Sequence, residues 1–139
     1  MIILDTNVLS ALMRRQPDAA VVRWLDHQPA DAAWLTAITI FEVRFGLALL
    51  AAGKRRRALT TAFDGMLAED FAHRVLDLDT AAADAAATLA AARQRAGRVV
   101  DLRDTLIAGI AQVRRATIAT GNTRHFADLD VPVVDPWAP

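Results

Sequence analysis

The sequence contains no cysteine and no tyrosine, and it has only one serine, Ser10, and one lysine, Lys54. Without cysteine the chain can form neither a disulfide framework nor a thiolate metal site, which is compatible with the cytosol. Ser10 lies in no Gly-x-Ser-x-Gly sequence, so the pattern of a serine hydrolase is missing. The glycines are scattered and form no phosphate-binding loop. Serine-triad, cysteine-nucleophile and glycine-loop chemistries are therefore disfavoured.

Long apolar runs and an excess of one charge are also missing. The longest stretch without a charged residue, 32–41, is far too short to cross a membrane. The N-terminus has no basic segment followed by an apolar core, so we expect no secretory signal and a cytoplasmic protein. The formal net charge is +0. The chain is therefore not a strongly basic domain of the kind that indicates nucleic-acid binding. A local basic groove is still compatible with a net charge of zero.

The pattern of apolar runs and turn residues predicts one α/β domain over 1–139. With 54% hydrophobic residues, the chain can build a core. Strands that alternate with helices indicate an α/β sandwich with a mostly parallel sheet. The expected strands are 1–4, 33–35, 74–78, 98–100, 116–120 and 131–134. A first helix is expected to start at residue 8. Five further helices are expected at 18–27, 36–52, 54–72, 80–96 and 103–115, with Gly53 and Gly97 as C-terminal caps.

Three acids stand in similar settings along this pattern. Asp5 ends the first apolar run and enters a helix, which is where open parallel sheets place their ligands. Glu42 follows an apolar segment at 37–41, and Asp104 follows the short strand expected at 98–100. If the three side chains converge, they form a site for a divalent cation.

Each acid also has a structural explanation as a helix cap. The segment 39–42 matches a capping box, in which Glu42 would bond back to the first amide of its helix. Asp101 is a plausible N-cap, with Asp104 in the first turn, where the helix dipole favours a negative charge. Asp5 or Thr6 could cap the first helix. Capping alone would explain any one of these acids.

Taken together, the acids favour a metal site. Glu42 is one of only two glutamates and interrupts an apolar segment, where a charge is costly unless it is paired. Clustered carboxylates repel one another and raise one another's pKa. A hard cation such as Mg²⁺ or Mn²⁺ relieves that repulsion, prefers oxygen ligands, and can bind a phosphate and activate water.

Other sites are less well supported. His27, His73 and His125 show no metal-ligand spacing, and we interpret them as surface or cap histidines. A phosphoacceptor receiver domain would also have an acidic pocket at the edge of its sheet. It would need a lysine at the end of a late strand, however, and Lys54 lies in a predicted helix.

Four segments, in order and across nearly the whole chain, resemble PIN-domain ribonucleases, specifically VapC/FitB-like toxins of prokaryotic toxin–antitoxin pairs. They are Ile-Leu-Asp-Thr-Asn-Val-Leu-Ser at 3–10, Ala-Ile-Thr-Ile-Phe-Glu-Val at 37–43, Asp-Thr-Leu-Ile-Ala-Gly-Ile-Ala at 104–111 and Ala-Thr-Gly-Asn-Thr-Arg-His-Phe at 119–126. The tail Asp-Pro-Trp at 135–137 is similar to that of FitB-type members.

The resemblance implies a PIN-like three-layer α/β/α sandwich of about five strands and Mg²⁺- or Mn²⁺-dependent cleavage of RNA. By position, the metal-binding acids are Asp5, Glu42 and Asp104. Many members carry a fourth acid where this chain has Asn122, so we expect three carboxylates, one well-held metal and a weak or absent second. Asn122 could instead be a turn residue after Gly121. Thr6 and Thr120 resemble positions near the site, which implies a support role.

The resemblance also implies three partners: an RNA substrate, a small cognate antitoxin protein and a second copy of the chain in a homodimer. The basic run 54–57 could contact RNA phosphates or be a solvated helix start. Arg14, Arg15, Arg98 and Arg103 lie nearer to the acids in the sequence. Apolar residues at 21–25 and 47–50 could form a dimer face and an antitoxin groove, or ordinary core. A catalytically inactive PIN-like interaction module, with the acids as caps only, remains the alternative.

Overall fold

The computed structural model describes residues 1–139 as five parallel strands with helices on both faces. The strands are β1 (Ile2–Leu4), β2 (Ala33–Thr36), β3 (Val75–Leu76), β4 (Thr117–Ala119) and β5 (Val133–Val134). The helices are α1 (Thr6–Met13), α2 (Ala19–Asp26), α3 (Ala37–Leu49), α4 (Lys54–Gly65), α5 (Thr80–Arg95) and α6 (Leu102–Arg114). A π-helical turn, Met66–Asp70, and a 3-10 turn, Thr123–Phe126, complete the elements. No helix is long and apolar enough to cross a membrane.

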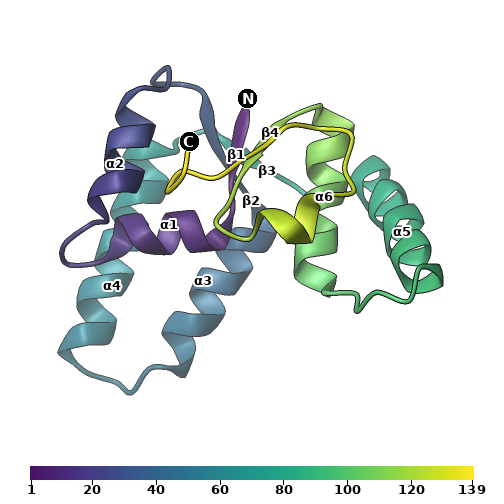
Figure 1. Ribbon diagram of the computed structural model, residues 1–139. Helices are drawn as coiled ribbons and strands as arrows, with labels where there is room; N and C mark the ends of the chain where they lie inside the picture. Colours follow the sequence, from purple (N-terminus) through teal and green to yellow (C-terminus); the bar gives the residue numbers. More distant parts are fainter.

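The sheet has the order β3-β2-β1-β4-β5, so β1 lies at its centre (Figure 1). Ile2 of β1 pairs with Ala33 of β2 on one side and with Thr117 of β4 on the other. The chain builds the sheet outward from β1 in one direction and later returns to build the other side. Ligands bind beyond the carboxyl ends of the strands at such a change of direction. In this fold that point lies between the ends of β1 and β4.

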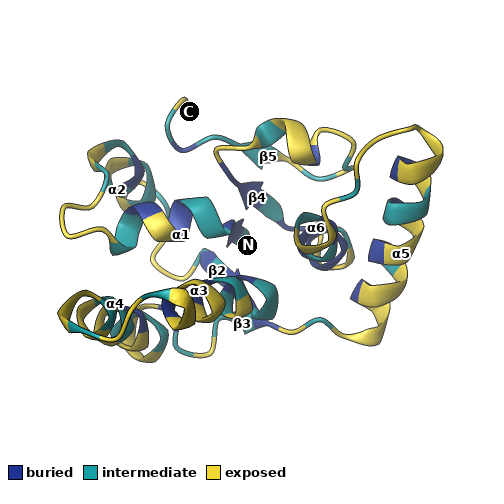
Figure 2. Ribbon diagram, turned by 90° about the horizontal axis from the view of Figure 1, so that it is seen from below, coloured by how far each residue is buried: buried dark blue, intermediate teal, exposed yellow.

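Two apolar clusters fill the space on either side of the sheet, which confirms the expected three-layer sandwich. Successive residues of a strand point to opposite faces, so Leu4 packs with Val8 and Phe63 on the side of α1 to α4, and Ile3 packs with Ile107 on the side of α5 and α6. Figure 2 shows the central strands buried and the outer helix faces exposed. The core therefore fixes β1 from both sides and holds its carboxyl end in place.

One predicted strand is wrong. Residues 98–100 form no strand, and the five strands are those at the other predicted positions. Val99 is 96% exposed, and Arg98 is held by a side-chain contact with Asp128 rather than by the sheet. The two valines suggested a strand, but this segment only connects Gly97 to the cap of α6. Gly97 follows α5 with a φ of 76°, as a C-terminal cap requires.

Helix boundaries differ from the prediction mainly in the α3–α4 hairpin. α3 ends at Leu49 rather than at 52, because Leu50 is already extended with a ψ of 145°. Gly53 precedes α4 as its N-cap residue and is not the C-cap of α3. α4 continues into the π-helical turn up to Asp70. These shifts lie away from the carboxyl edge of the sheet.

Candidate active site at the carboxyl edge of the sheet

Asp5 is a nearly buried carboxylate at the end of β1. It caps α1, because its Oδ1 accepts a hydrogen bond from the Thr6 amide at 2.8 Å. Its Oδ2 accepts from Thr120 Oγ1 at 2.8 Å and from Asn7 Nδ2 at 3.2 Å. Burial nevertheless raises the pKa of Asp5 above its usual value despite these donors, and nearby Asp104 adds to the rise. The site therefore holds a carboxylate whose charge is only partly compensated.

Glu42 is not a helix cap, so the capping-box interpretation is wrong. Thr36 is the N-cap of α3, and its hydroxyl accepts from the Thr39 amide at 3.2 Å. Glu42 comes six residues after this cap and reaches across to α1, where Thr6 Oγ1 donates to its Oε1 at 3.0 Å. Burial raises the pKa of Glu42, and the charges of Asp5 and Asp104 raise it further. Glu42 thus lacks the structural explanation that the sequence offered for it.

Asp104 lies in the first turn of α6, as expected, although no strand precedes it. Asp101 is the N-cap and its Oδ1 accepts from the Asp104 amide at 3.1 Å. The Asp104 side chain is 18% exposed, and its Oδ2 lies 2.7 Å from His125 Nδ1. The backbone amide of Asp104 satisfies the cap, which leaves its carboxylate to face the site.

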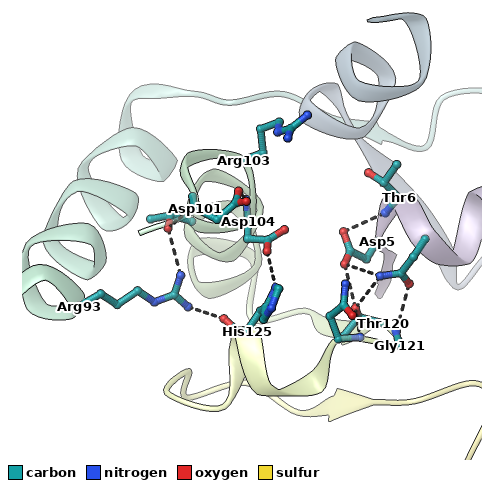
Figure 3. A network of polar contacts seen from close by, with 12 residues as sticks. Asp5, Thr6, Arg93, Asp101, Arg103, Asp104, Thr120, Gly121 and His125 are labelled. Atoms are coloured by element: carbon teal, nitrogen blue, oxygen red, sulfur yellow. Dashed lines mark hydrogen bonds and ion pairs between the residues drawn. The ribbon is translucent and has the colours of Figure 1, made fainter. Parts of the chain in front are cut away.

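The three acids belong to one electrostatic environment. Asp5 and Asp104 point toward one another across the site (Figure 3), and each of these acids raises the pKa of Glu42. No group of three His, Asp or Glu side chains lies close enough to hold one ion in these positions. Mg²⁺ usually keeps several waters and binds through one or two carboxylates plus a substrate phosphate. The oxygen donors and the only partly compensated charge of the acids therefore fit this type of cation.

A network of neutral groups orients Asp5. Asn7 donates to Asp5 and also to Thr120 Oγ1 at 3.2 Å, while its own Oδ1 accepts from the Gly121 amide at 3.0 Å. These bonds join the end of β4 to the start of α1. Thr6 and Thr120 contact the acids directly, in agreement with the support role expected for them. This role of Asn7 in orienting Asp5 was not predicted from the sequence, although Asn7 directly follows Asp5 and Thr6.

Asn122 is tied to the site through its backbone. Its amide donates to Thr120 Oγ1 at 3.0 Å, and the residue itself is exposed. Gly121, just before it, packs so closely against Trp137 that an added Cβ would lie 3.0 Å from the indole. This geometry fits the turn interpretation of Asn122, while a contact of its side chain with a metal stays a prediction.

Two nitrogen-bearing side chains, His125 and Arg103, reach the acids. His125 was interpreted as a surface or cap histidine, and its side chain is indeed 54% exposed, but its ring also contacts Asp104, a contact that the sequence did not predict. Arg103 Nη1 lies 3.8 Å from Glu42 Oε2 and is 49% exposed, so it is the basic neighbour that does reach the site. Arg14 and Arg98 pair instead with Asp18 and Asp128.

Most of the apolar residues proposed for interfaces belong to the core. Val21 is fully buried, Leu47 is 8% exposed, and Trp24 and Leu25 pack against the core from the edge. Leu49, by contrast, is 72% exposed. A different apolar surface was not foreseen: Phe41 and Phe45, which stack on each other, are 57% and 50% exposed.

The amino-acid sequence matches the PIN domain over residues 2–132. The chain belongs to the PIN-domain family. It is 39% identical over 139 residues to VapC ribonuclease Y4jK of Sinorhizobium fredii, a match that covers 100% of this chain and 99% of that protein. It is 37% identical over 137 residues to toxin FitB of Neisseria gonorrhoeae, covering 99% of each. The solved structure of FitAcB from Neisseria gonorrhoeae superposes with a TM-score of 0.88 at 37% identity, covering 99% of each chain.

These matches confirm the resemblance to VapC/FitB-like proteins and the PIN-like fold. They extend over almost the full length of the chain, so the similarity includes all three layers and is not limited to one motif. The four segments that carried the resemblance cover the ends of β1 and β4, the first parts of α1 and α3, most of α6 and the 3-10 turn.

Proposed function

We propose that this PIN-domain chain is a metal-dependent endoribonuclease that acts as the toxin of a toxin–antitoxin pair. The observation that carries the proposal is the set of buried and half-buried acids at the switch between β1 and β4, whose charges are only partly compensated, with Glu42 free of any capping role. The names of the relatives, a VapC ribonuclease and a toxin, agree with this activity. Hydrolysis of an RNA phosphodiester is the reaction that these groups suit.

Asp5, Glu42 and Asp104 would hold the cation, which is Mg²⁺ or Mn²⁺ by its oxygen ligands. Such an ion activates water and stabilises the charge that develops on a phosphate. Asn7 and Thr120 keep the Asp5 carboxylate oriented. Thr6 does the same for Glu42, so two ligands are held on different helices by one hydrogen-bonded network. Metal-ligand carboxylates need such hydrogen-bonded neighbours.

Arg103, beside Glu42, and His125, beside Asp104, would assist the three acids in substrate binding and ligand orientation. Arg103 is half-exposed and contacts Glu42 at the long distance of 3.8 Å, so its guanidinium can turn to a phosphate oxygen of the substrate. The His125 ring fixes one oxygen of Asp104. Asn122 supplies no charge, so we retain the expectation of one well-held metal and a weak or absent second.

A small antitoxin protein and a second copy of the chain are the proposed partners. Phe41, Phe45 and Leu49 recur at every fourth residue and form an exposed apolar stripe along α3 that begins beside Glu42. An antitoxin segment laid along this stripe would end at the acids, where a basic side chain could pair with Glu42. Exposed apolar patches of this kind mark surfaces that bind another protein.

The alternative is an inactive interaction module, favoured by the observation that no three acids lie within the spacing of one ion's ligands. Asp5 does cap its helix, as that alternative requires. Glu42 argues against it, because a half-buried acid in an apolar segment without a capping role needs another reason to persist.

Expression in cells tests the proposal. Wild-type protein made without its partner should arrest growth, and Asp104→Asn should relieve the arrest while keeping the fold, because the cap bond is made by the backbone amide of Asp104. Co-expression of the small protein encoded beside the toxin should restore growth. A folded Asp104→Asn protein that remains equally toxic would rule out metal-dependent hydrolysis and favour the interaction module.

A further inference from the structure

Arg93 of α5 is a buried charge outside the acidic site. It is 4% exposed, yet it lies on a helix whose other buried residues are alanine and leucine. Its guanidinium makes four hydrogen bonds to groups that come from two other segments of the chain. Burying a guanidinium is costly unless all its donors find partners. The position of these partners shows what the arginine connects.

The partners of Arg93 lie on the two segments that bring Asp104 and His125 together. Two bonds of 2.9 Å form a fork to the Asp128 carboxylate, one bond of 3.0 Å reaches Thr105 Oγ1, and one of 2.8 Å reaches the His125 carbonyl. Thr105 directly follows Asp104 on α6. His125 is the residue whose ring contacts Asp104. Figure 3 shows Arg93 extending from α5 toward His125, on the far side of Asp104 from Asp5.

Arg93 therefore closes a loop of contacts around Asp104. One arm holds α6 through the residue after Asp104, and the other holds the 3-10 turn through the backbone of His125. The 3-10 turn is short and exposed at Arg124 and His125, so it has little packing of its own at this end. A planar fork with fixed donors can set the distance between two such segments, whereas a flexible ammonium cannot.

Arg98 is a matched contrast that the structure itself supplies. It binds the same carboxylate, with Nη1 at 2.8 Å from Asp128 Oδ2, but it is 41% exposed and has no bond to Thr105 or His125. If Asp128 only needed a positive neighbour, either arginine would serve. The buried one carries the additional contacts toward the site.

We propose that Arg93 is a positioning residue that holds the His125 ring against Asp104 and so sets the place of the Asp104 carboxylate. The consequence for metal binding rests on the proposed function, but the contact between His125 and Asp104 does not. Arg93 touches no substrate, and it acts through the backbone of His125 and through Thr105.

Three variants test the proposal: Arg93→Met, which removes the fork, Arg93→Lys, which keeps the charge but not the planar geometry, and Arg98→Met as the control. The first measurement is the NMR signals of the His125 ring, recorded without metal at one fixed pH. The second is Mn²⁺ affinity by calorimetry, and the third is kcat and KM on a short RNA. All are recorded well below the melting temperature of each variant.

The ring signals of His125 should change in both Arg93 variants and stay as in wild type in Arg98→Met. Mn²⁺ affinity should fall about tenfold in Arg93→Met, the lower end of the effect for partners of metal ligands, because Arg93 acts through intermediate contacts. The fall in cleavage should be in kcat and not in KM. A merely structural arginine would lower the melting temperature and leave these readouts unchanged.

The outcomes separate this inference from the proposed function. If wild type binds Mn²⁺ and folded Arg93→Lys and Arg93→Met keep its affinity, its kcat and its His125 signals, the positioning role is wrong. Should Arg98→Met change the signals as much as Arg93→Met, the charge of the pair and not the fork is responsible, and the proposal again fails. If wild type neither binds Mn²⁺ nor cuts RNA while the signals change only in the Arg93 variants, the positioning role stands and the proposed function fails.

Discussion

Replacing Glu42 by glutamine should change stability in opposite directions with and without metal. Glutamine keeps the size of the side chain, and its carbonyl oxygen can still accept the hydrogen bond from Thr6. What it removes is a charge that burial and the two neighbouring aspartates disfavour, and the nearby Arg103 and the Thr6 bond only partly offset this. Without metal, the Glu42→Gln protein should therefore be at least as stable as wild type. With metal, it lacks a ligand.

The size of the metal effect follows from linkage. At a concentration of Mn²⁺ about a hundredfold above the dissociation constant, binding stabilises wild type by about 2.7 kcal/mol. A variant that binds tenfold more weakly gains only about 1.4 kcal/mol at the same concentration. The difference, about 1.3 kcal/mol, corresponds to a melting temperature lower by roughly 4 °C for a domain of this size.

The pH dependence of the metal-free proteins gives a further check on this reasoning. The folded-state pKa of Glu42 is raised from its ordinary value of 4.5, so the ionised side chain costs stability at neutral pH. As the pH falls through the raised pKa, Glu42 becomes protonated in the folded state and this cost fades. The advantage of Glu42→Gln in EDTA should therefore be present at neutral pH and vanish in acid.

Thermal melts in EDTA and in Mn²⁺ measure all of this, with Glu69→Gln as the control. Glu69 is the other glutamate of the chain and is exposed, so its substitution should leave both melts as in wild type. The account of Glu42 fails if the Glu42→Gln protein is less stable than wild type in EDTA. It also fails if Mn²⁺ shifts both proteins equally.

Four other substitutions, one of them a control, test separate parts of the structure. Asp128→Asn should cost about 1–3 kcal/mol at neutral pH. The pKa of Asp128 is lowered by its bond with Arg93, so the stability from its charge is present above its ordinary value of 3.8 and is lost as the pH falls through the lower folded pKa. A deficit that persists unchanged at pH 2 in chemical denaturation would contradict this. Gly109→Ala should cost about 1–3 kcal/mol, because its Cβ would lie 2.6 Å from the Ala82 carbonyl oxygen of α5. Gly46→Ala, with nothing within 4 Å, should instead stabilise α3 by up to about 1 kcal/mol, and equal effects at both sites would refute the packing argument. Asn122→Asp should tighten the binding of a second cation, measured by calorimetric titration. Isotherms identical to those of wild type would assign Asn122 to turn geometry alone.

The sequence was sufficient for the parts of the site that are locally determined. Asp5 could be found because an apolar run gives way to a helix at that point, and the end of a central parallel strand is a known place for ligands. Asp104 could be placed in a first helical turn because Asp101 caps it. In both cases the capping contact is between residues fewer than five positions apart.

The wrong predictions come from patterns that tertiary structure overrides. The segment 39–42 has the form of a capping box, but Thr36 caps the helix and Glu42 turns to α1 instead. The valines before Asp101 suggested a strand, yet they lie in an exposed connection with no strand beside them. The local pattern could not show that Glu42 bonds to α1 or that 98–100 has no neighbouring strand, because both depend on residues far away in the sequence.

Contacts over long separations in the chain were not predictable. His125 and Asp104 are 21 residues apart, and Arg93 and Asp128 are 35 apart. Their meeting depends on how the 3-10 turn after β4 folds back onto α6. A histidine without ligand spacing and an arginine in an alanine-rich helix gave no local signal of a shared role.

Cleavage of RNA by the purified protein is the most direct test of the central claim, that Asp5, Glu42 and Asp104 hold a catalytic cation. Wild type should cut RNA with Mg²⁺ or Mn²⁺, stop in EDTA and recover when the metal is restored. Asp104→Asn should remain folded and lose cleavage under every condition. Cleavage by wild type that continues unchanged in EDTA, or cleavage by folded Asp104→Asn at the wild-type rate, would contradict the account.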